Sequence, residues 1–373
     1  MTNRPTVRFR RSPHLVSYWS AEGLVFHNYA TGVRTGATPD TAWILDFFDV
    51  WRSLAELEQH LSAFDPRSLR RSVSGLVRRS LLQRSDRVRD VERRLETWGN
   101  WNPAAGFFHF STRDLPYQPT DVANAQLADK AESVPVPSFI KHLSRAKRVP
   151  LPPADADGVV PSVLLSRRTW RRFSPQPLAL QDLATLLGLT FGVQGWMDAG
   201  VQGRVPLKTS PSGGARHPLE AYVLAVRVKG LPRGLYHYAA DDHALERIRG
   251  KATPQQLVRY LSTQWWYGHA SALVLMTAVF ARSQWRYDFA RGYRAVLLEA
   301  GHFCQTFCLA ATWLGLAPFC SMALADSLIE KDLRIDGVTE SVLYAAGVGM
   351  RPPGVKSAQR PPEQRGNWSL DEC

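Results

Sequence analysis

The sequence predicts an α+β protein of two or three domains. Three observations predict this class: β-rich apolar runs alternate with helical patterns, one long helical segment is apolar nearly all round, and one stretch holds too many prolines for a long helix or a central strand. The chain has 373 residues, and its 45% hydrophobic content is ordinary for chains that bury a core. Disordered and collagen-like chains are therefore excluded.

The first ninety residues predict a small winged-helix-like module. Residues 23–28, GLVFHN, have the composition of a short strand, and Pro39 predicts the first turn of a helix. Ser53 and Glu56 have the spacing of a capping box, which predicts the start of a second helix. Asp65 predicts the cap of a third helix with one apolar face, which precedes a closing LLQR segment.

The third helix carries Arg70, Arg71, Arg78 and Arg79 mostly on one face, which could bind DNA. A solvated helix face is the commoner reason for such a pattern. The whole chain has 46 Lys and Arg against 33 Asp and Glu, a net charge of +13, which favours anionic partners. Because no segment is a polybasic tail, we expect no nucleic acid partner.

A proline-rich stretch over residues 115–162 predicts a connector or an extended arm. Before it lies an aromatic-rich segment, residues 99–114, which we expect to pack on the larger domain. The helices expected beyond residue 163 span 178–192 and 292–316, and the expected core strands span 219–228, 271–280 and 341–349. Since residues 292–316 are apolar nearly all round, we expect the core or a subunit interface to bury this helix on every side.

Four successive segments follow from these patterns. They are the winged-helix-like module (1–90), a helical and proline-rich connector (91–162), the main domain (163–355) and a polar tail (356–373). Residues 308–325 are uncharged, but Gly315 and Pro318 interrupt them, so they predict a buried helix, a turn and a strand rather than a membrane span. No apolar segment follows the basic N-terminus, so we expect no secretory signal and no membrane partner.

The four cysteines are too few for a disulfide scaffold, and no C-x-x-C pair indicates zinc. Cys304 and Cys308 are expected to be small core residues of the long helix. Glu299 and His302 have the spacing of a di-iron ligand pair but lack a second copy, so together with Thr306 they predict buried polar groups with partners. We expect a cytoplasmic protein with no metal site.

Two segments of the main domain could bind a phosphorylated or planar ligand. Residues 167–173, RRTWRRF, contain four guanidinium groups and one hydroxyl that could hold a phosphate dianion. Residues 210–218, SPSGGARHP, contain paired glycines, which let the backbone lie against a flat ligand and offer its amides. Neither pattern is a P-loop or a dinucleotide fingerprint. The alternatives are a solvated arginine run and a plain loop.

A third segment, residues 285–294, crowds polar and aromatic groups immediately before the long helix. Tyr287 could transfer a proton if neighbouring cations stabilised its phenolate. Arg286 cannot be the base, because a guanidinium group stays protonated.

Five blocks of the sequence occur in an order that resembles one family. They are RRTWRRF (167–173), PSGGARHPLEAY (211–222), GLYHY (234–238), RGYRAVLLEAGHFCQ (291–305), and LGL (314–316) followed by GVGMRP (347–352). Together they resemble the nitroreductase-fold flavoproteins of the SagB-type peptide dehydrogenase group, the azoline oxidases, over about residues 160–353. The first ninety residues resemble the winged-helix module that often precedes such domains and resembles peptide-recognition elements.

The resemblance implies a nitroreductase-like FMN domain, with a central sheet flanked by helices, in an intertwined homodimer with the flavin at the subunit boundary. The implied FMN-binding residues are Arg167, Arg168, Thr169, Arg171, Pro211, Ser212, Gly213, Gly214, Gln305, Ser321, Met322 and Arg351. Tyr287 is the implied proton acceptor, beside Arg286. The group usually carries Lys-Tyr at this pair, and Gln-Asn where this chain has Gln305-Thr306.

The leading hypothesis is therefore an FMN-dependent oxidoreductase of natural-product biosynthesis, which dehydrogenates a thiazoline or oxazoline to an azole on a peptide or carrier-bound intermediate. Its expected partners are that substrate, a second copy of the chain and a biosynthetic complex. One alternative is an NAD(P)H-dependent flavin reductase of an alkene, quinone or nitro group. The other is a non-catalytic scaffold of a biosynthetic complex.

Overall fold

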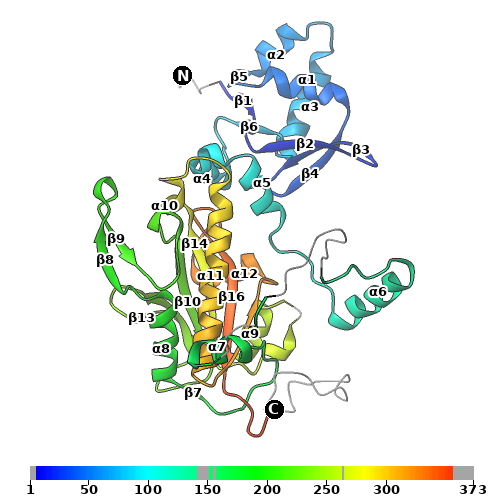
Figure 1. Cartoon of the computed structure of the whole chain (residues 1–373). Helices are drawn as coiled ribbons and strands as arrows, with labels where there is room; N and C mark the ends of the chain where they lie inside the picture. The colour runs from blue at the N-terminus through cyan, green and yellow to red at the C-terminus, as the bar shows by residue number, and fades with distance from the viewer. Residues whose placement is uncertain (1–5, 141–150, 154–156, 263, 356–373) are drawn as a thin grey trace. The chain divides into compact units, whose positions relative to one another are not determined.

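The computed structural model describes residues 6–140, 151–153, 157–262 and 264–355 (Figure 1). The chain divides into two compact units. Unit 1 is residues 1–113, 279–297 and 335–341, and unit 2 is residues 114–278, 298–334 and 342–373. Each unit is built from separate stretches of the chain, and the four successive segments expected above stay a prediction about domains.

Unit 1 contains two small antiparallel sheets, of order β5-β1-β6 and β2-β3-β4, and a set of short helices. Its strands are β1 (Arg8–Arg11), β2 (Leu15–Ser20), β3 (Gly23–Asn28), β4 (Val33–Ala37), β5 (Arg52–Ser53) and β6 (Leu82–Arg84). Its helices are α1 (Pro39–Phe47), α2 (Leu54–His60), α3 (Pro66–Arg78), α4 (Asp90–Leu95), the 3-10 helix η1 (Glu96–Trp101), α5 (Ala104–Ser111) and α10 (Phe280–Gln284).

The local signals of the first ninety residues are confirmed. Strand β3 spans residues 23–28, and α1 begins at Pro39. The Ser53 hydroxyl accepts a hydrogen bond from the Glu56 amide at 3.2 Å, and the Glu56 carboxylate accepts one from the Ser53 amide at 2.6 Å, so the capping box is present. Asp65 caps α3 by accepting from the Ser68 amide at 2.8 Å. The winged-helix character of the module stays a prediction.

The aromatic-rich segment lies next to Trp98, whose partners come from residues 279–297 and 335–341 of the same unit, so packing on the larger domain stays a prediction. Trp98 is fully buried, and its ring lies 4.9 Å from that of Phe280 and 6.0 Å from that of Tyr293. Its indole donates a hydrogen bond to the Val338 carbonyl at 2.9 Å. Burial lowers the pKa of the neighbouring His109 to about 3, so this imidazole is neutral in the core.

Unit 2 is built on a six-stranded sheet of order β13-β12-β10-β14-β16-β15, which Figure 1 shows running along helix α11. The strands of the sheet are β10 (Leu219–Ala225), β12 (Gly234–Ala239), β13 (Ala244–Gly250), β14 (Ala272–Val279), β15 (Ala317–Ser321) and β16 (Glu340–Gly349). The smaller pairs are β7 (Leu178–Ala179) with β11 (Val228–Lys229), and β8 (Gly195–Asp198) with β9 (Arg204–Leu207).

The helices of unit 2 are α6 (Thr120–Ser133), α7 (Val159–Ser166), α8 (Leu180–Phe191), α9 (Pro254–Tyr260) and α12 (Asp326–Leu333), with the 3-10 helices η2 (Gly200–Gln202), η3 (Gly213–Ala215) and η4 (Trp265–Tyr267). Helix α11 (Gly292–Trp313) belongs to unit 1 up to Leu297 and to unit 2 from Leu298 on. The expected core strands and the two expected helices are confirmed. Within the described residues, no helix combines the length and the apolar character needed to cross a bilayer. Residues 308–325 form the expected end of a helix, a turn and a strand.

One expectation about helices was wrong, and a second keeps one of its two alternatives. The connector contains a 14-residue helix, α6, because the stretch between Pro119 and Pro135 is free of proline. Part of the connector, residues 141–150 and 154–156, lies outside the described residues. Helix α11 is not buried on every side within one chain, since Leu298 is 65% exposed and Trp313 is 54% exposed. A subunit interface is the alternative that the sequence left open for this exposed side.

One charged group on the sheet of unit 2 makes stability depend on pH. His237 on β12 lies between two carboxylates, with Nε2 3.1 Å from Glu220 and Nδ1 2.7 Å from Glu246. Hydrogen bonding to Glu220, and then to Glu246, raises the pKa of His237 to about 9 against the effect of burial. The folded state therefore binds a proton that the unfolded chain releases near pH 6.5.

We expect this contribution to be fully present below about pH 6.5 and to be lost as the pH rises through about 9. Urea unfolding of wild type and of His237→Gln, measured from pH 6 to 10, checks this result. The difference between the free energies of unfolding of the two proteins should shrink by at most about 1.4 kcal/mol per pH unit. The observed slope should be smaller than this limit, because solvent screens the partly exposed ion pairs of His237. A difference that stays constant across this window would contradict the assignment.

Candidate functional site

The arginine-rich segment follows α7 as extended chain. The backbone of Arg167 ends α7, and Arg168 turns back so that its guanidinium donates to the carbonyls of Leu165 and Arg167, at 2.9 and 2.7 Å. Thr169 is partly buried, and Arg168 and Arg171 are exposed. In the described part of the chain, Arg167, Arg168 and Arg171 form no salt bridge. Three cationic groups are thus left without an acidic side chain to balance them.

The segment is joined to strand β15 and to the end of β16. The Trp170 amide donates to the Pro318 carbonyl at 2.9 Å, and the Arg351 guanidinium lies 5.2 Å from the centre of the buried Trp170 ring. Arg351 also donates to the carbonyls of Leu316 and Thr312, at 2.8 and 3.3 Å, near the C-terminus of α11. Burial lowers the pKa of Arg351. Arg351 therefore caps α11 while it packs against the arginine segment.

The diglycine loop is held on α11 by the polar stripe of that helix. Ser212 donates to the Glu299 carboxylate at 2.6 Å, and the hydroxyls of Ser210 and Thr306 are 2.7 Å apart. The His302 imidazole lies 3.4 Å from the Pro211 carbonyl. Each residue of the stripe thus has a partner in the loop, as expected, but only Glu299 is buried, while Thr306 is partly buried and His302 is exposed.

The loop itself has a backbone that favours glycine. Gly213 and Gly214 lie in the short helix η3, where Gly214 has φ +60°, and the next residue, Ala215, has φ +55°. Such left-handed conformations turn successive amides toward one side, a geometry that can bind anions or ring acceptors.

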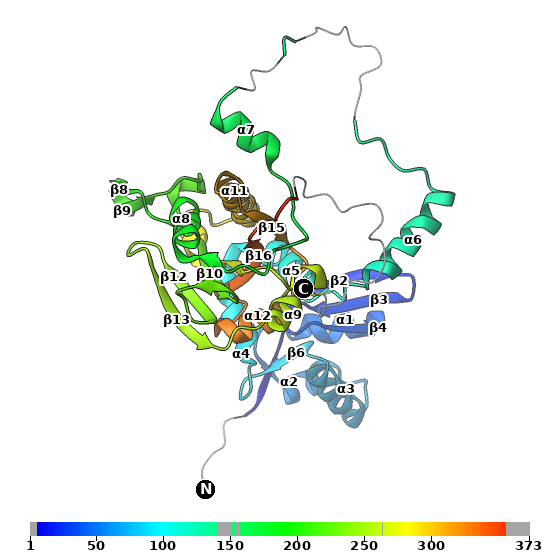
Figure 2. The same cartoon turned by 90° about the horizontal axis from the view of Figure 1, so that it is seen from below.

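The diglycine loop contacts one face of α11, and the opposite face carries the cysteines that face β15, the strand to which the arginine segment is hydrogen-bonded. At 100° per residue, Glu299, His302 and Thr306 point roughly 170° away from Cys304 and Cys308, which face β15. Figure 2 shows α11 almost end-on, beside both α8 and β15. A third side of the helix, with Gln305, is exposed. One copy of the chain therefore separates the arginine segment from the diglycine loop by the width of a helix.

Strand β15 ends at Ser321, which with Met322 is among the FMN-binding residues that the resemblance implies. Phe319 is buried, and its ring stacks on that of Tyr267 at 3.7 Å. Ser321 is buried and accepts a hydrogen bond from Gln264 at 2.6 Å, whereas Met322 is 76% exposed. Of these candidates, Met322 is the side chain that is open to a ligand.

Tyr287 and Arg286 belong to unit 1 and follow α10. The Arg286 guanidinium lies 5.7 Å from the centre of the Tyr287 ring, and the Tyr287 carbonyl accepts a hydrogen bond from the Trp101 indole at 2.8 Å. The described residues give the Tyr287 hydroxyl no hydrogen-bond partner. The candidate cofactor residues all lie in unit 2, so the two groups of candidates are described separately.

A cavity of about 450 Å³ lies in unit 1, close in sequence to Tyr287. Its lining includes Phe108, Arg291, Tyr293, Arg294 and Leu297. Residues 285–294 are crowded with polar and aromatic groups in the sequence, but this pattern did not predict a cavity. The missing information was the position of α5, whose Ala104, Ala105 and Phe108 line the cavity together with residues 290–297.

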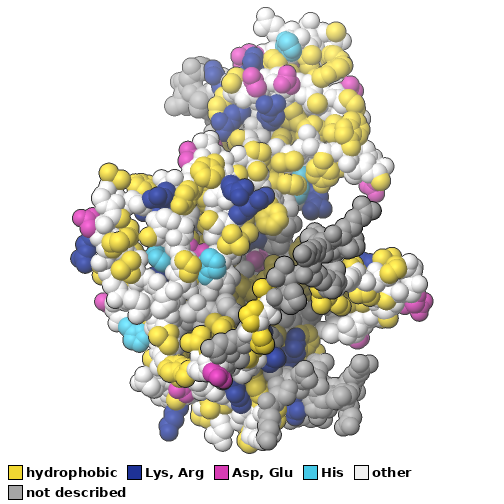
Figure 3. Space-filling view, viewed as in Figure 1, with side chains coloured by type: hydrophobic (Ala, Val, Ile, Leu, Met, Phe, Trp, Pro, Cys, Tyr) yellow, Lys and Arg dark blue, Asp and Glu magenta, His cyan; other side chains and the backbone are white. Residues whose placement is uncertain are grey.

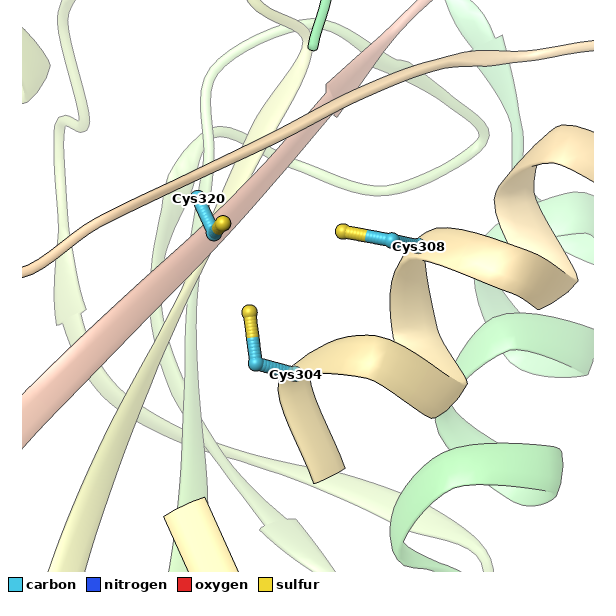
Figure 4. Close-up of side chains that lie close together, drawn as sticks. All are labelled: Cys304, Cys308 and Cys320. Carbon is cyan, nitrogen blue, oxygen red and sulfur yellow. The ribbon is translucent and has the colours of Figure 1, made fainter. Parts of the chain in front are cut away.

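Cysteines form a group that the sequence analysis missed. Cys304 and Cys308 are buried, as expected, but Cys320 of β15 joins them, and the three sulfur atoms lie within 4.8 Å of one another (Figure 4). Hydrogen bonds from Cys304 and Cys308 hold the pKa of the Cys320 thiol well below its usual value, although burial acts in the opposite direction. The i, i+4 spacing was visible in the sequence, but the approach of Cys320 depends on how the strand packs.

One arginine of the α3 face already has an acidic partner within unit 1, since Arg70 forms a salt bridge with Glu58 at 2.7 Å. Figure 3 shows the Lys and Arg side chains of the visible face in several separate groups among hydrophobic and acidic ones. Neither observation adds to the DNA-binding alternative.

Comparison with known proteins identifies the family. A family model described as the nitroreductase family matches residues 164–350. The nitroreductase-like protein MJ1384 of Methanocaldococcus jannaschii is 33% identical over 173 residues, which cover 46% of this chain and 83% of that protein. The trifolitoxin-processing protein TfxB of Rhizobium leguminosarum bv. trifolii is 26% identical over 369 residues, which cover 90% of this chain and 94% of that protein.

Among solved structures, a nitroreductase-like protein from Anabaena variabilis aligns with 26% identity and a TM-score of 0.45, over 52% of this chain and 38% of that chain. The family model spans the arginine segment, the diglycine loop, α11 and β15. The fold class expected from the resemblance is thus confirmed, and the chain belongs to the nitroreductase family.

Proposed function

We propose that this nitroreductase-family protein is an FMN-dependent oxidoreductase that acts on a peptide-derived intermediate in natural-product biosynthesis. The observation that carries the proposal is the similarity to a trifolitoxin-processing protein over 90% of the chain. The family model itself matches only residues 164–350, so the similarity extends well beyond the family domain. A shared N-terminal part is what an enzyme would need if it must also recognise a peptide.

The donor groups of the arginine segment suit the phosphate of FMN. Arg167, Arg168 and Arg171 have no acidic partner in the described residues, and guanidinium groups bind phosphate through paired, charge-assisted hydrogen bonds. The backbone at Gly214 and Ala215, at positive φ, offers amides that suit the polar edge of a planar ring. When bound, FMN supplies the two-electron acceptor for hydride removal.

We infer that each FMN site combines two copies of the chain. The arginine segment and the diglycine loop lie on opposite faces of α11, so one ligand that touches both needs the loop of a second copy. The exposed side of α11, with Leu298 and Trp313, provides apolar surface that a second copy could cover. In this arrangement, the second copy would cover the apolar side chains that one copy of the chain leaves exposed on α11.

The reaction we propose is dehydrogenation of a thiazoline or oxazoline, which loses a hydride and a proton to become an azole. Tyr287 would take the proton at its Oη atom, because that hydroxyl has no hydrogen-bond partner among the described residues. The Arg286 guanidinium, 5.7 Å from the ring centre, would stabilise the phenolate form of Tyr287, which is the form that can accept the proton.

Tyr287→Phe is the substitution that tests this role. We expect it to lower the rate of product formation by about 100- to 10,000-fold, the usual range for loss of a general acid or base. FMN content and melting temperature should stay at wild-type values, since the variant keeps the ring and its packing. Product formation in a reconstituted pathway and single-turnover flavin bleaching measure the effect, and Tyr18→Phe on β2 serves as the matched control.

An unchanged rate in Tyr287→Phe would remove this residue from the mechanism. The reductase alternative is tested separately by mixing the purified protein with NADPH in a stopped-flow instrument. Rapid bleaching of the flavin by NADPH alone would favour the reductase. Bleaching only by the azoline substrate favours the proposed dehydrogenase.

A further inference from the structure

We propose that Cys304, Cys308 and Cys320 form a binding site for one zinc ion. All three sulfur atoms lie within 4.8 Å of one another, and Figure 4 shows the side chains of Cys304 and Cys308 extending from α11 toward Cys320. Thiolates are ligands that zinc prefers. This site lies beyond the proposed oxidoreductase function and does not depend on it.

The position of each cysteine is fixed by regular structure. Cys304 and Cys308 are one turn apart on α11, so their side chains leave the same face of the helix. Cys320 is held by the pairing of β15 with β16, where it lies opposite Ala346. A zinc ion with bonds of about 2.3 Å in tetrahedral geometry spaces its sulfur ligands about 3.8 Å apart. The observed group therefore needs to contract by roughly 1 Å or less.

The surroundings balance the charge of a divalent ion. Arg167 acts electrostatically on Cys308 and Cys320, so its guanidinium lies near the group. Three thiolates and one divalent ion carry a net charge of −1, whereas a monovalent ion would leave a charge of −2 in a buried place, so a divalent ion is favoured. The Tyr344 hydroxyl donates a hydrogen bond to the Cys320 sulfur at 3.3 Å, as the outer partners of metal ligands do.

The fourth coordination position is open within the described residues. No histidine, aspartate, glutamate or further cysteine of that part of the chain joins the group. Cys304 and Cys308 are buried, and Cys320 is partly exposed, so a water molecule or another small ligand would reach the ion from the Cys320 side. Three protein ligands with an open position are the arrangement of zinc sites that exchange a ligand.

Cobalt and zinc binding by the full-length protein tests the proposal. The protein is reduced, stripped with a chelator and titrated with Co²⁺, which should produce a thiolate-to-cobalt charge-transfer band and visible bands at wavelengths beyond flavin absorption. Zn²⁺ should displace the cobalt at one ion per chain. We expect Cys304→Ser and Cys320→Ser to weaken zinc binding by more than about 100-fold, and Tyr344→Phe to weaken it by about 10-fold.

The control is Cys373→Ser, which changes the remaining cysteine, outside the described residues, and should bind zinc as the wild type does. Circular dichroism checks that each variant is folded. The wild-type titration decides the matter even if a variant does not fold. No charge-transfer band in the wild type, unchanged zinc affinity in folded Cys320→Ser, or a disulfide that forms within the trio and excludes the metal would each overturn the proposal.

Discussion

Replacement of Arg168 and Arg171 together by alanine is expected to deprive the protein of FMN. Both side chains are exposed, and neither forms a salt bridge in the described residues, so the phosphate of the cofactor would be their main partner. A hydrogen bond to a charged group contributes about 1.5–3 kcal/mol, so loss of two should weaken FMN binding by about 100- to 10,000-fold. Absorbance of the purified protein and titration with FMN measure the result.

The control is Arg233→Ala, which removes an exposed arginine that lies before β12 and should leave FMN binding unchanged. Retention of FMN at wild-type affinity by the double variant would refute the phosphate site. The melting temperature should fall little, because exposed arginines contribute little to stability.

The same variant tests whether each site combines two copies. A second chain carrying Gly214→Val has a defective loop, since a β-branched residue is strained at φ +60°. In mixed dimers, one of the two sites would receive the intact arginine segment of one chain and the intact loop of the other. Co-expression should therefore restore FMN to about a quarter of all sites if the chains pair at random. No restoration in dimers shown to be mixed would place both segments at the same site of one chain.

Trp98→Ala is expected to cause the largest loss of stability in unit 1, about 3–5 kcal/mol. The side chain is fully buried and removal would leave a large cavity among Trp101, His109, Phe110, Phe280 and Tyr293. It would also leave the Val338 carbonyl without its indole donor. Urea unfolding followed by circular dichroism measures the free energy of unfolding of this unit.

Trp43→Ala is the matched control, because this tryptophan of α1 is 67% exposed and its loss should change stability by no more than about 0.5 kcal/mol. Equal effects of the two substitutions would mean that the cluster around Trp98 does not hold unit 1 together.

The sequence predicted those features that depend on neighbours along the chain. The Ser53–Glu56 box, the Asp65 cap and the strand at residues 23–28 each follow from residue types within one or two turns. Helix α11 was predicted because apolar residues recur throughout its 22 positions and no proline interrupts the pattern. Such signals act between near neighbours in the sequence, so they do not depend on how the rest of the chain packs.

Features that depend on packing across the chain could not be predicted. No periodicity relates Cys320 to Cys304, because their proximity is set by the pairing of β15 with β16 and its placement against α11. The hydrogen bonds of Ser212 to Glu299 and of Ser210 to Thr306 join residues that are 87 and 96 positions apart. The sequence indicated that both ends of these bonds were polar and unusual, but not that they were partners.

The diglycine loop and β15 pack on opposite faces of α11, and this separation affects how the protein tolerates substitutions. An α-helix with its side chains is about 10–12 Å across, so substitutions in the diglycine loop and in β15 lie too far apart to interact directly within one copy. Their effects on folding should therefore add, and the loop and the strand can diversify independently. Any non-additive energy between them would have to pass through a ligand or a neighbouring subunit, which makes thermodynamic coupling a direct report on assembly.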